Sequence, residues 1–445
     1  MPLPVNSAVL PLPLGIEAGT TAQTLPQSTK QPKPTSAAGG VESGYAWFRL
    51  MVAMLMSTIG GVGMWSVVVT LPVVQAEFGV DRAAASLPYT LAMVGFALGG
   101  LLMGRASDRF GVMVPLVGGT VMLGLGYVAS SFATSLWQLA LAHMIPIAML
   151  GCSATFSPLI ADISQWFTRN RGIAMAIAAC GNYLSATLSG PIVQSLVQSY
   201  GWRQTHVIIG LFCLATMLPL AMVFRRPPPF QESTAGDAGS AGRLADLGIS
   251  PQALQILLIV AGVACCVAMS MPQVHIVAYC ADLGYGAARG AEMLSLMMGF
   301  GIVSRLLSGW ISDYIGGLRT LVLGSILQGV ALLMYLPSDA LMSLYVVSAL
   351  FGLFQGGLVP SYALIVREFY PAREAGTRIA LCVTATIAGM ALGGWMSGVI
   401  YDQTGNYQAA FLNGIAWNLL NLSIAGWMLW RVWGAKGHGK QLAAA

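Results

Sequence analysis

The chain has 445 residues, of which 56% are hydrophobic and only 8% are charged, with a formal net charge of +5. A soluble domain usually carries about 25% charged residues, so this composition argues against a soluble enzyme, a nucleic-acid binder and a disordered scaffold. The cations lie between hydrophobic stretches and do not gather in one basic segment, so no nucleic-acid partner is expected. The balance is that of a membrane protein with many spans.

The first 44 residues lack the basic start and the continuous apolar core of a signal peptide, and they are rich in Pro, Thr, Ser and Gln. We expect residues 1–44 to be a disordered cytoplasmic tail.

Twelve later stretches are long and apolar enough to cross a bilayer, which takes about 20 residues each. They are expected at 48–76, 85–105, 113–132, 136–163, 171–197, 203–224, 252–281, 288–311, 318–336, 341–366, 376–401 and 408–431.

A polar stretch divides these spans into two sets of six. It opens with Arg225-Arg226-Pro227-Pro228-Pro229 and is then rich in Ser, Gly, Ala and Asp. We therefore expect a cytoplasmic linker at 225–250 between six-helix bundles at 45–224 and 251–432, with a cytoplasmic tail at 433–445.

The distribution of Lys and Arg predicts the orientation. Seventeen of the 21 fall on the side of the predicted spans that holds both termini, and three (Arg82, Arg203 and Arg289) fall on the other side. Because positive residues are enriched in cytoplasmic loops, both termini are expected in the cytoplasm of a multi-pass inner (plasma) membrane protein. The remaining cation, Arg305, lies inside a span.

The two halves carry a repeated pattern, G-x-x-x-D-x-x-G, after the second and the eighth span. Its residues are Gly104, Asp108 and Gly111 in the first copy and Gly309, Asp313 and Gly316 in the second. Glycine permits a tight turn between helices, and Asp can accept hydrogen bonds from the N-terminus of a neighbouring helix. A generic turn would explain one copy, but two copies at an offset of 205 residues indicate parallel repeats, which are typical of transporters.

With these two loops, residues 45–432 resemble the major facilitator superfamily. The resemblance implies an all-α membrane protein with twelve transmembrane helices in two six-helix bundles. It also implies a gating or structural role for the residues of both loops, Arg109 included. Val112 and Met113 depart from the family pattern, because basic residues usually follow the first copy.

Two further stretches are similar to the monocarboxylate transporter family. They are Glu42-Ser43-Gly44-Tyr45-Ala46-Trp47, before the first span, and Trp166-Phe167-Thr168-Arg169-Asn170-Arg171-Gly172-Ile173-Ala174-Met175-Ala176, at the entry of the fifth. The resemblance implies a gating or structural role for Arg169 and Arg171. An interfacial belt of aromatic and basic residues is the alternative explanation.

Arg305 is the most informative single residue. It lies eight residues, or about 12 Å, before the loop residue Asp313, and a charge at that depth usually faces a water-filled cavity. No carboxylate lies within one turn of it, and Gly301 is expected to leave room beside the guanidinium for a ligand carboxylate. The monocarboxylate transporters also carry an Arg in the eighth span. Snorkelling to the cytoplasmic interface is the alternative.

His275, in the seventh span, is the first candidate for a proton-coupling group, because bacterial relatives often carry a similar His and imidazole titrates near neutral pH. A His bonded to a backbone carbonyl is the alternative. Animal members of the family have an Asp at the position of Gly301 and a Lys in the first span, and both are absent here, so their proton relay cannot be copied.

Other polar side chains in the spans are weaker candidates for the substrate cavity, since such groups also link helices. They are His143, Asn182, Gln355 and Trp65, with Thr384 and Thr386 weaker still. Asp162 is expected in a structural ion pair, with Arg169 and Arg171 close in sequence. The seven cysteines, and the GxxxG pairs Gly95/Gly99, Gly100/Gly104 and Gly389/Gly393, are expected to serve packing.

These features predict a secondary transporter of small monocarboxylates, such as lactate or pyruvate, by proton symport and alternating access. Arg305 would bind the carboxylate and His275 the proton. An anion exchanger of the oxalate/formate type is one alternative, and a non-transporting receptor or assembly factor on the same fold is another. No nucleotide-binding loop or metal motif is present, so no enzyme activity, cofactor or metal is expected. The expected partners are an organic anion, a proton and the bilayer, with a monomer as the simplest assembly.

Overall fold

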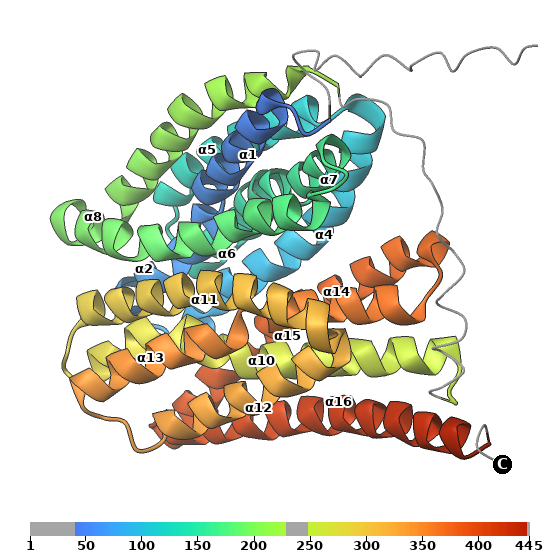
Figure 1. Cartoon of the computed structure of the whole chain (residues 1–445). Helices are drawn as coiled ribbons and strands as arrows, with labels where there is room; N and C mark the ends of the chain where they lie inside the picture. Colours follow the sequence, from blue (N-terminus) through green and yellow to red (C-terminus); the bar gives the residue numbers. More distant parts are fainter. Residues whose placement is uncertain (1–40, 228–247, 443–445) are drawn as a thin grey trace, which may run out of the picture. The chain divides into compact units, whose positions relative to one another are not determined.

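A computed structural model describes residues 41–227 and 248–442 of the chain (Figure 1). The predicted tail at 1–44 and linker at 225–250 therefore lie mostly outside the described residues. All elements of the described part are helical. In the first half they are α1 (Gly44–Gly60), α2 (Val62–Phe78), α3 (Arg82–Ala85), α4 (Leu87–Phe110), α5 (Met113–Ser131), α6 (Leu136–Ala142), η1 (His143–Gly151), η2 (Cys152–Thr155), α7 (Ser157–Trp166), α8 (Arg171–Ala221) and η3 (Met222–Arg225). In the second half they are α10 (Pro251–Asp282), α11 (Ala287–Ile315), α12 (Gly317–Tyr335), α13 (Leu341–Gln355), α14 (Leu358–Phe369), α15 (Ala372–Thr404) and α16 (Gln408–Leu442).

Helix α8 combines two predicted spans. It is 51 residues long, yet both its ends lie beside the start of α1, because Glu42 accepts a hydrogen bond from the backbone N–H of Asn170 and Arg49 donates to the carbonyl of Val223. The chain folds back at Gly201, whose φ of 75° lies in the left-handed region that favours glycine. The prediction of separate spans at 171–197 and 203–224 is thus correct in number, although the turn is a single residue.

Ten helical segments of the described residues are long and apolar enough to cross a membrane, and the one that contains α8 holds two passes. Helix α16 adds a further pass. Its first end adjoins Tyr407, which contacts Arg82 at one end of the bundles, and Arg319 stacks over its Trp433 at the other. The residues between them span about 39 Å, enough for the hydrocarbon core. The all-helical, multi-span fold is confirmed, and α16 continues to Leu442, beyond the predicted end of the last span.

Two spans at equivalent places of the halves are interrupted. The fourth consists of α6, the π-helix η1, the 3-10 helix η2 and α7, and Pro146 within η1 cannot donate a backbone hydrogen bond. The tenth is broken at Gly356 and Gly357, between α13 and α14. Interrupted helices of this kind are typical of the spans that line transporter sites.

Glycines allow close helix packing, as predicted for the GxxxG pairs. A Cβ on Gly95 or Gly99 of α4 would overlap the backbone carbonyls of Met144 and Met149. A Cβ on Gly389 or Gly393 of α15 would come within 2.5–2.6 Å of carbonyl oxygens of α10. Gly104 is different, because nothing lies within 4 Å of its Cβ position. The seven cysteines are buried and unbridged.

The two stretches that resemble the monocarboxylate transporters meet in space. Glu42 accepts the N–H of Asn170 at 2.7 Å, and Tyr45 and Trp47 pack against Trp166 and Phe167, with ring centroids 5.3 and 5.0 Å apart. The start of the first span, the end of the fourth and the start of the fifth are therefore joined at one end of the bundles. We call this end, where α1 begins and α16 ends, the terminal end.

Asp162 is paired as predicted, but its partner is Arg49. Arg49 donates to both carboxylate oxygens of Asp162 at 2.7 Å, and both side chains are almost fully buried. The guanidinium lies between the rings of Trp166 and Phe224 and also donates to the carbonyl of Arg226. Arg49, one of the seventeen cations that the sequence predicts on the side of the termini, is thus buried in an ion pair.

The repeated loops turn as predicted, with φ of 77° at Gly111 and 84° at Gly316. Their aspartates, Asp108 and Asp313, are exposed, and the described structure gives neither carboxylate a hydrogen bond. The N-terminus of α12 donates instead to Glu368 of α14, through the N–H of Gly317 at 2.6 Å. In this conformation Glu368, and not Asp313, accepts the hydrogen bond from the N-terminus of the neighbouring helix that was predicted for Asp313.

Helices α1–α8 and α10–α16 form two groups, which pack against each other through α8 with α11 and through α3 and α4 with α15 (Figure 1). The hydrogen bonds between the groups include those from Arg82 to Asp282 and from Arg305 to Ala179. Arg82 lies at the end of the bundles opposite the terminal end.

Candidate functional site

Arg305 lies at the contact between the two halves. Its Nη1 donates to the carbonyl of Ala179 in α8 at 3.3 Å, and its Nε donates to the carbonyl of Gly356, at the break between α13 and α14, at 3.4 Å. The side chain is half-buried, and no carboxylate pairs with it among the described residues. A guanidinium has five N–H donors, so most of them remain available for a ligand.

Tyr183 lies beneath the guanidinium. The Cζ of Arg305 is 4.2 Å from the centroid of the Tyr183 ring, which favours a cation–π contact. A Cβ on Gly301 would come within 2.6 Å of the same ring. The room predicted beside Gly301 is therefore occupied by Tyr183, which supports one face of the guanidinium, while the edges carry the free N–H groups.

Two of the predicted substrate residues, Asn182 and Gln355, lie on the elements that contact Arg305, and a third, Trp65 of α2, bonds one of them. Trp65 donates to the side-chain oxygen of Asn182 at 3.0 Å, and Asn182 precedes Tyr183. On the other side, Gln355 precedes Gly356 and accepts a hydrogen bond from Gln273 at 2.8 Å. The amide nitrogen of Gln355 is buried and has no partner. A buried unpaired donor costs about 1–3 kcal/mol, so an acceptor from a ligand or water would stabilise this position.

His275 is fully buried, and both its ring nitrogens are engaged. Nε2 lies 2.8 Å from the carbonyl oxygen of Gly394, and Nδ1 lies 3.3 Å from the hydroxyl of Tyr407. The first contact matches the alternative stated for this residue, a His bonded to a backbone carbonyl. Through Tyr407 the residue is linked to Arg82.

His143 lies inside the first half. Its Nδ1 bonds the carbonyl of Leu139 at 2.9 Å, and its ring lies 5.6 Å from that of His206 and 6.4 Å from that of Tyr127, between centroids. These contacts join it to its own bundle, and the structure gives it no contact with Arg305.

The predicted gating residues are mostly exposed at the terminal end. Arg109 lies over the ring of Phe110, with 5.2 Å to the centroid, and Arg169 is exposed. The side chain of Arg171 lies outside the described residues. The described structure gives these residues no contact between the halves.

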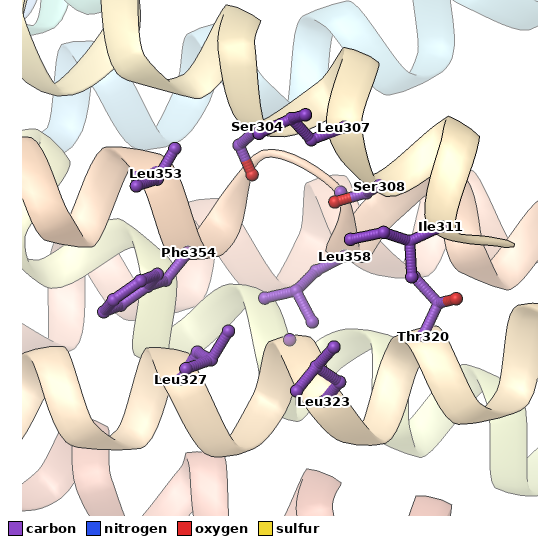
Figure 2. A pocket seen from close by; sticks show the side chains of 12 residues that line it. Ser304, Leu307, Ser308, Ile311, Thr320, Leu323, Leu327, Leu353, Phe354 and Leu358 are labelled. Carbon is purple, nitrogen blue, oxygen red and sulfur yellow. The ribbon is translucent and has the colours of Figure 1, made fainter. Parts of the chain in front are cut away.

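A cavity of about 180 Å³ lies within the second half, between α11, α12 and the broken tenth span (Figure 2). Its walls are mainly leucines, and the side chains of Ser304 and Ser308 face it. A second hollow, of about 450 Å³, lies between α8 and α11. Neither is lined by a predicted substrate residue, so we place the candidate site at Arg305 and not in these cavities.

A profile of the Major Facilitator Superfamily matches residues 53–341 and 293–438. The chain belongs to the major facilitator superfamily. It is therefore a membrane transporter and not an enzyme. The predicted fold and the predicted resemblance are both confirmed by this match.

Among curated relatives of the superfamily, monocarboxylate transporter 13 of Bos taurus is 28% identical over 381 residues, which cover 83% of this chain and 86% of the relative. Monocarboxylate transporter 11 of Homo sapiens is 26% identical over 423 residues, which cover 87% and 83%. The chain is thus a distant homologue of monocarboxylate transporters.

Solved structures agree with the fold. A bacterial homologue of the human lysosomal transporter Spinster, inward-facing and occupied, matches with a TM-score of 0.65 and 14% identity, over 88% of this chain and 97% of that one. The peptide transporter POT in complex with sulfate matches with a TM-score of 0.68 and 14% identity, again over 88% and 97%. At such identities the likeness concerns the fold alone.

Tyr183 and the surroundings of Arg82 cannot be recognised from the sequence. An aromatic residue inside an apolar span carries no signal of its own, and Arg82 resembles an ordinary cation of a loop between spans. The sequence does contain one signal for Arg82, which is one of only three cations predicted on the non-cytoplasmic side of the membrane. Nothing in the sequence links it to Asp282 and Asp402, which lie 200 and 320 positions further along the chain.

Proposed function

We propose that this secondary transporter carries small monocarboxylates by proton symport, through alternating access of a site at Arg305. The observation that supports it is an intramembrane guanidinium without a carboxylate partner among the described residues, seated on Tyr183 and bonded to one carbonyl of each half. Such a cation suits a carboxylate ligand, which binds through two parallel hydrogen bonds. The distant homology to monocarboxylate transporters supports the same substrate class.

Carboxylate binding would change how the halves are joined. The N–H groups of Arg305 that now donate to Ala179 and Gly356 do so over 3.3 and 3.4 Å, near the upper limit for hydrogen bonds. A charged carboxylate is a stronger acceptor than a carbonyl, so it would compete for these donors. Substrate binding would thereby loosen the contact between Arg305 and α8.

Uptake of labelled lactate by proteoliposomes, with and without an inward proton gradient, tests the proposal. We expect gradient-driven uptake in the wild type and a loss of about 10- to 100-fold in Arg305→Ala, because hydrogen bonds to charged groups contribute about 1.5–3 kcal/mol each. Arg305→Lys keeps the charge without the bidentate geometry and should recover only part of the uptake.

Arg289→Gln is the matched control, since it removes an exposed cation, paired with Glu292, from the same helix. Equal uptake by the wild type and Arg305→Ala would refute the anion site. A wild type that takes up no monocarboxylate would refute the substrate class.

Anion exchange is the second candidate, and the contacts of His275 favour it, since both ring nitrogens are already engaged. Counterflow separates the two functions. Uptake that requires an internal anion and ignores the proton gradient would favour exchange, whereas uptake driven by the gradient into anion-free vesicles would favour symport.

A further inference from the structure

Charged side chains join the two halves at the end of the bundles opposite the terminal end. Arg82, at the start of α3, donates through Nη2 to both carboxylate oxygens of Asp282 at 3.1 Å, and through Nη1 to the hydroxyl of Tyr407 at 2.9 Å. The backbone N–H groups of Arg82 and Ala83 donate to the carboxylate of Asp402 at 2.9 and 2.7 Å. We call Arg82, Asp282, Asp402 and Tyr407 the Arg82 cluster.

The cluster is a closed contact. Arg82 is 6% exposed although it carries a charge, and its guanidinium also lies over the ring of Tyr401. A Cβ on Gly398 of α15 would come within 2.8 Å of the Cα of Ala83, so backbone lies directly against backbone. Alternating access requires this end to open in another conformation, and the cluster must then separate.

His275 is the buried continuation of the cluster, and its contacts define its tautomer. The carbonyl of Gly394 can only accept, so the proton lies on Nε2. Arg82 can only donate, so the oxygen of Tyr407 accepts from it and the Tyr407 hydroxyl is free to donate to Nδ1. Burial raises the pKa of Tyr407, which keeps this hydroxyl protonated. The closed cluster therefore fits a neutral imidazole.

A second proton on His275 conflicts with this arrangement. It would place an N–H on Nδ1 where the Tyr407 hydroxyl now donates, so this hydroxyl would have to turn its proton away, and it would add a buried cation beside the guanidinium. The carboxylates of Asp282 and Asp402 already serve Arg82 and the N-terminus of α3. The titratable and charged groups around His275 and the cluster, from all packed elements among the described residues, are Asp81, Arg82, Tyr89, Tyr279, Cys280, Asp282, Tyr285, Asp339, Tyr401, Asp402 and Tyr407.

We propose that closure of the Arg82 cluster and protonation of His275 exclude one another, so that the cluster couples a proton to the opening of this end. When Arg82 withdraws, the neighbouring cation leaves, and the oxygen of Tyr407, which stays beside His275 in the second half, is free to accept from a protonated Nδ1. When the cluster closes, the proton must leave. The biological use of this switch rests on the proposed symport, but the switch itself is a property of the empty protein.

The test measures opening directly and involves no substrate. Spin labels are placed at Phe132→Cys, directly after α5, and at Met342→Cys, in the first turn of α13. These positions are 75% and 74% exposed and lie in the first and second half at this end. The seven native cysteines are buried, which limits background labelling. Pulsed electron resonance on the reconstituted full chain gives the populations of short and long distances between pH 5 and pH 8.

In the wild type, the ratio of long to short distances should rise as the pH falls, by up to about tenfold per pH unit, as linkage to one proton requires. His275→Gln should remove this dependence. His206→Gln is the matched control, a buried His of the first half that bonds Ser130 and does not contact the cluster, and it should keep the dependence. Tyr407→Phe, which removes the link between Arg82 and His275, should weaken it.

Asp282→Asn should raise the long-distance population at every pH, because it removes the ion pair of the cluster. A wild type whose distances ignore pH, or a response that survives in both His275→Gln and Tyr407→Phe, would overturn the coupling. An Asp282→Asn protein that stays closed would overturn the assignment of the cluster as a closing contact. None of these results depends on whether lactate is transported, so failure here is distinct from failure of the proposed substrate.

Discussion

At the scale of single residues, buried charges decide most of what is particular to this chain. Arg49 and Asp162 form an ion pair that is withdrawn from both water and lipid, between Trp166 and Phe224. Desolvation of two charges offsets much of their attraction, so such a pair adds little net stability. Removal of one of the two charges lowers the stability of the protein, because the other charge is then buried without a partner.

Asp162→Asn should therefore lower the free energy of unfolding by about 3–5 kcal/mol, since it leaves the Arg49 guanidinium without its counter-ion. The double variant Arg49→Met, Asp162→Leu should recover most of this loss. Denaturant titration in detergent, followed by intrinsic fluorescence, measures both. Arg289→Gln, in an exposed i,i+3 pair, should leave the free energy of unfolding nearly unchanged. A single variant as stable as the wild type would contradict the burial of the pair.

The sequence identifies candidate site residues only where their side chains are energetically costly in a membrane. It does not identify the residues that surround and support them. Arg305 could be found because a charge in the middle of a span needs a reason. Its support, Tyr183, could not, because a tyrosine among apolar residues is ordinary, and the gap expected at Gly301 is filled by that ring. Asp282 and Asp402 each look like loop carboxylates until the fold brings them to Arg82.

At the scale of elements, the apolar stretches predict the spans well, and the departures occur where local backbone chemistry intervenes. The turn at Gly201 is a single residue, so α8 contains two passes, and Pro146 lies in a π-helical stretch within the fourth span. Hydropathy averaged over about 20 residues does not detect such features. The repeated glycines were predicted to serve packing, but only the structure separates those that touch a neighbouring helix from those that do not.

Helix α4 offers a matched comparison of two such glycines. Gly99→Ala should destabilise the protein by about 1–3 kcal/mol, because the new Cβ would overlap the carbonyl of Met149 in the fourth span. Gly104→Ala should be neutral or slightly stabilising, since its Cβ position is open and Ala is the better helix former. Thermal unfolding in detergent compares the two, and equal losses would contradict the packing described here. A Gly104→Ala protein of normal stability but reduced transport would place the need for this glycine in another conformation.

At the scale of the whole molecule, the number of passes and the distribution of charge have to agree. Helix α16 contains Asn413, Asn418 and Asn421 and is not among the ten helical segments of the described residues that are apolar enough to cross a membrane by composition alone. Its contacts with the Arg82 cluster at one end and with Arg319 at the other nevertheless place its two ends at opposite ends of the bundles. An even number of passes returns the chain to the terminal end. Seventeen of the 21 Lys and Arg residues are predicted on that side, so we expect it to face the cytoplasm.

Two cysteine substitutions test this orientation, Phe132→Cys at the end that holds the Arg82 cluster and Tyr314→Cys in the last turn of α11 at the terminal end. The two side chains are similarly exposed, at 75% and 74%, and the native cysteines are buried. A membrane-impermeant maleimide applied to intact cells should label Phe132→Cys at once and Tyr314→Cys only after permeabilisation. The reverse pattern would contradict the orientation. It would also turn the Arg82 cluster toward the cytoplasm, and protonation of His275 would then open the transporter to the inside and not to the outside.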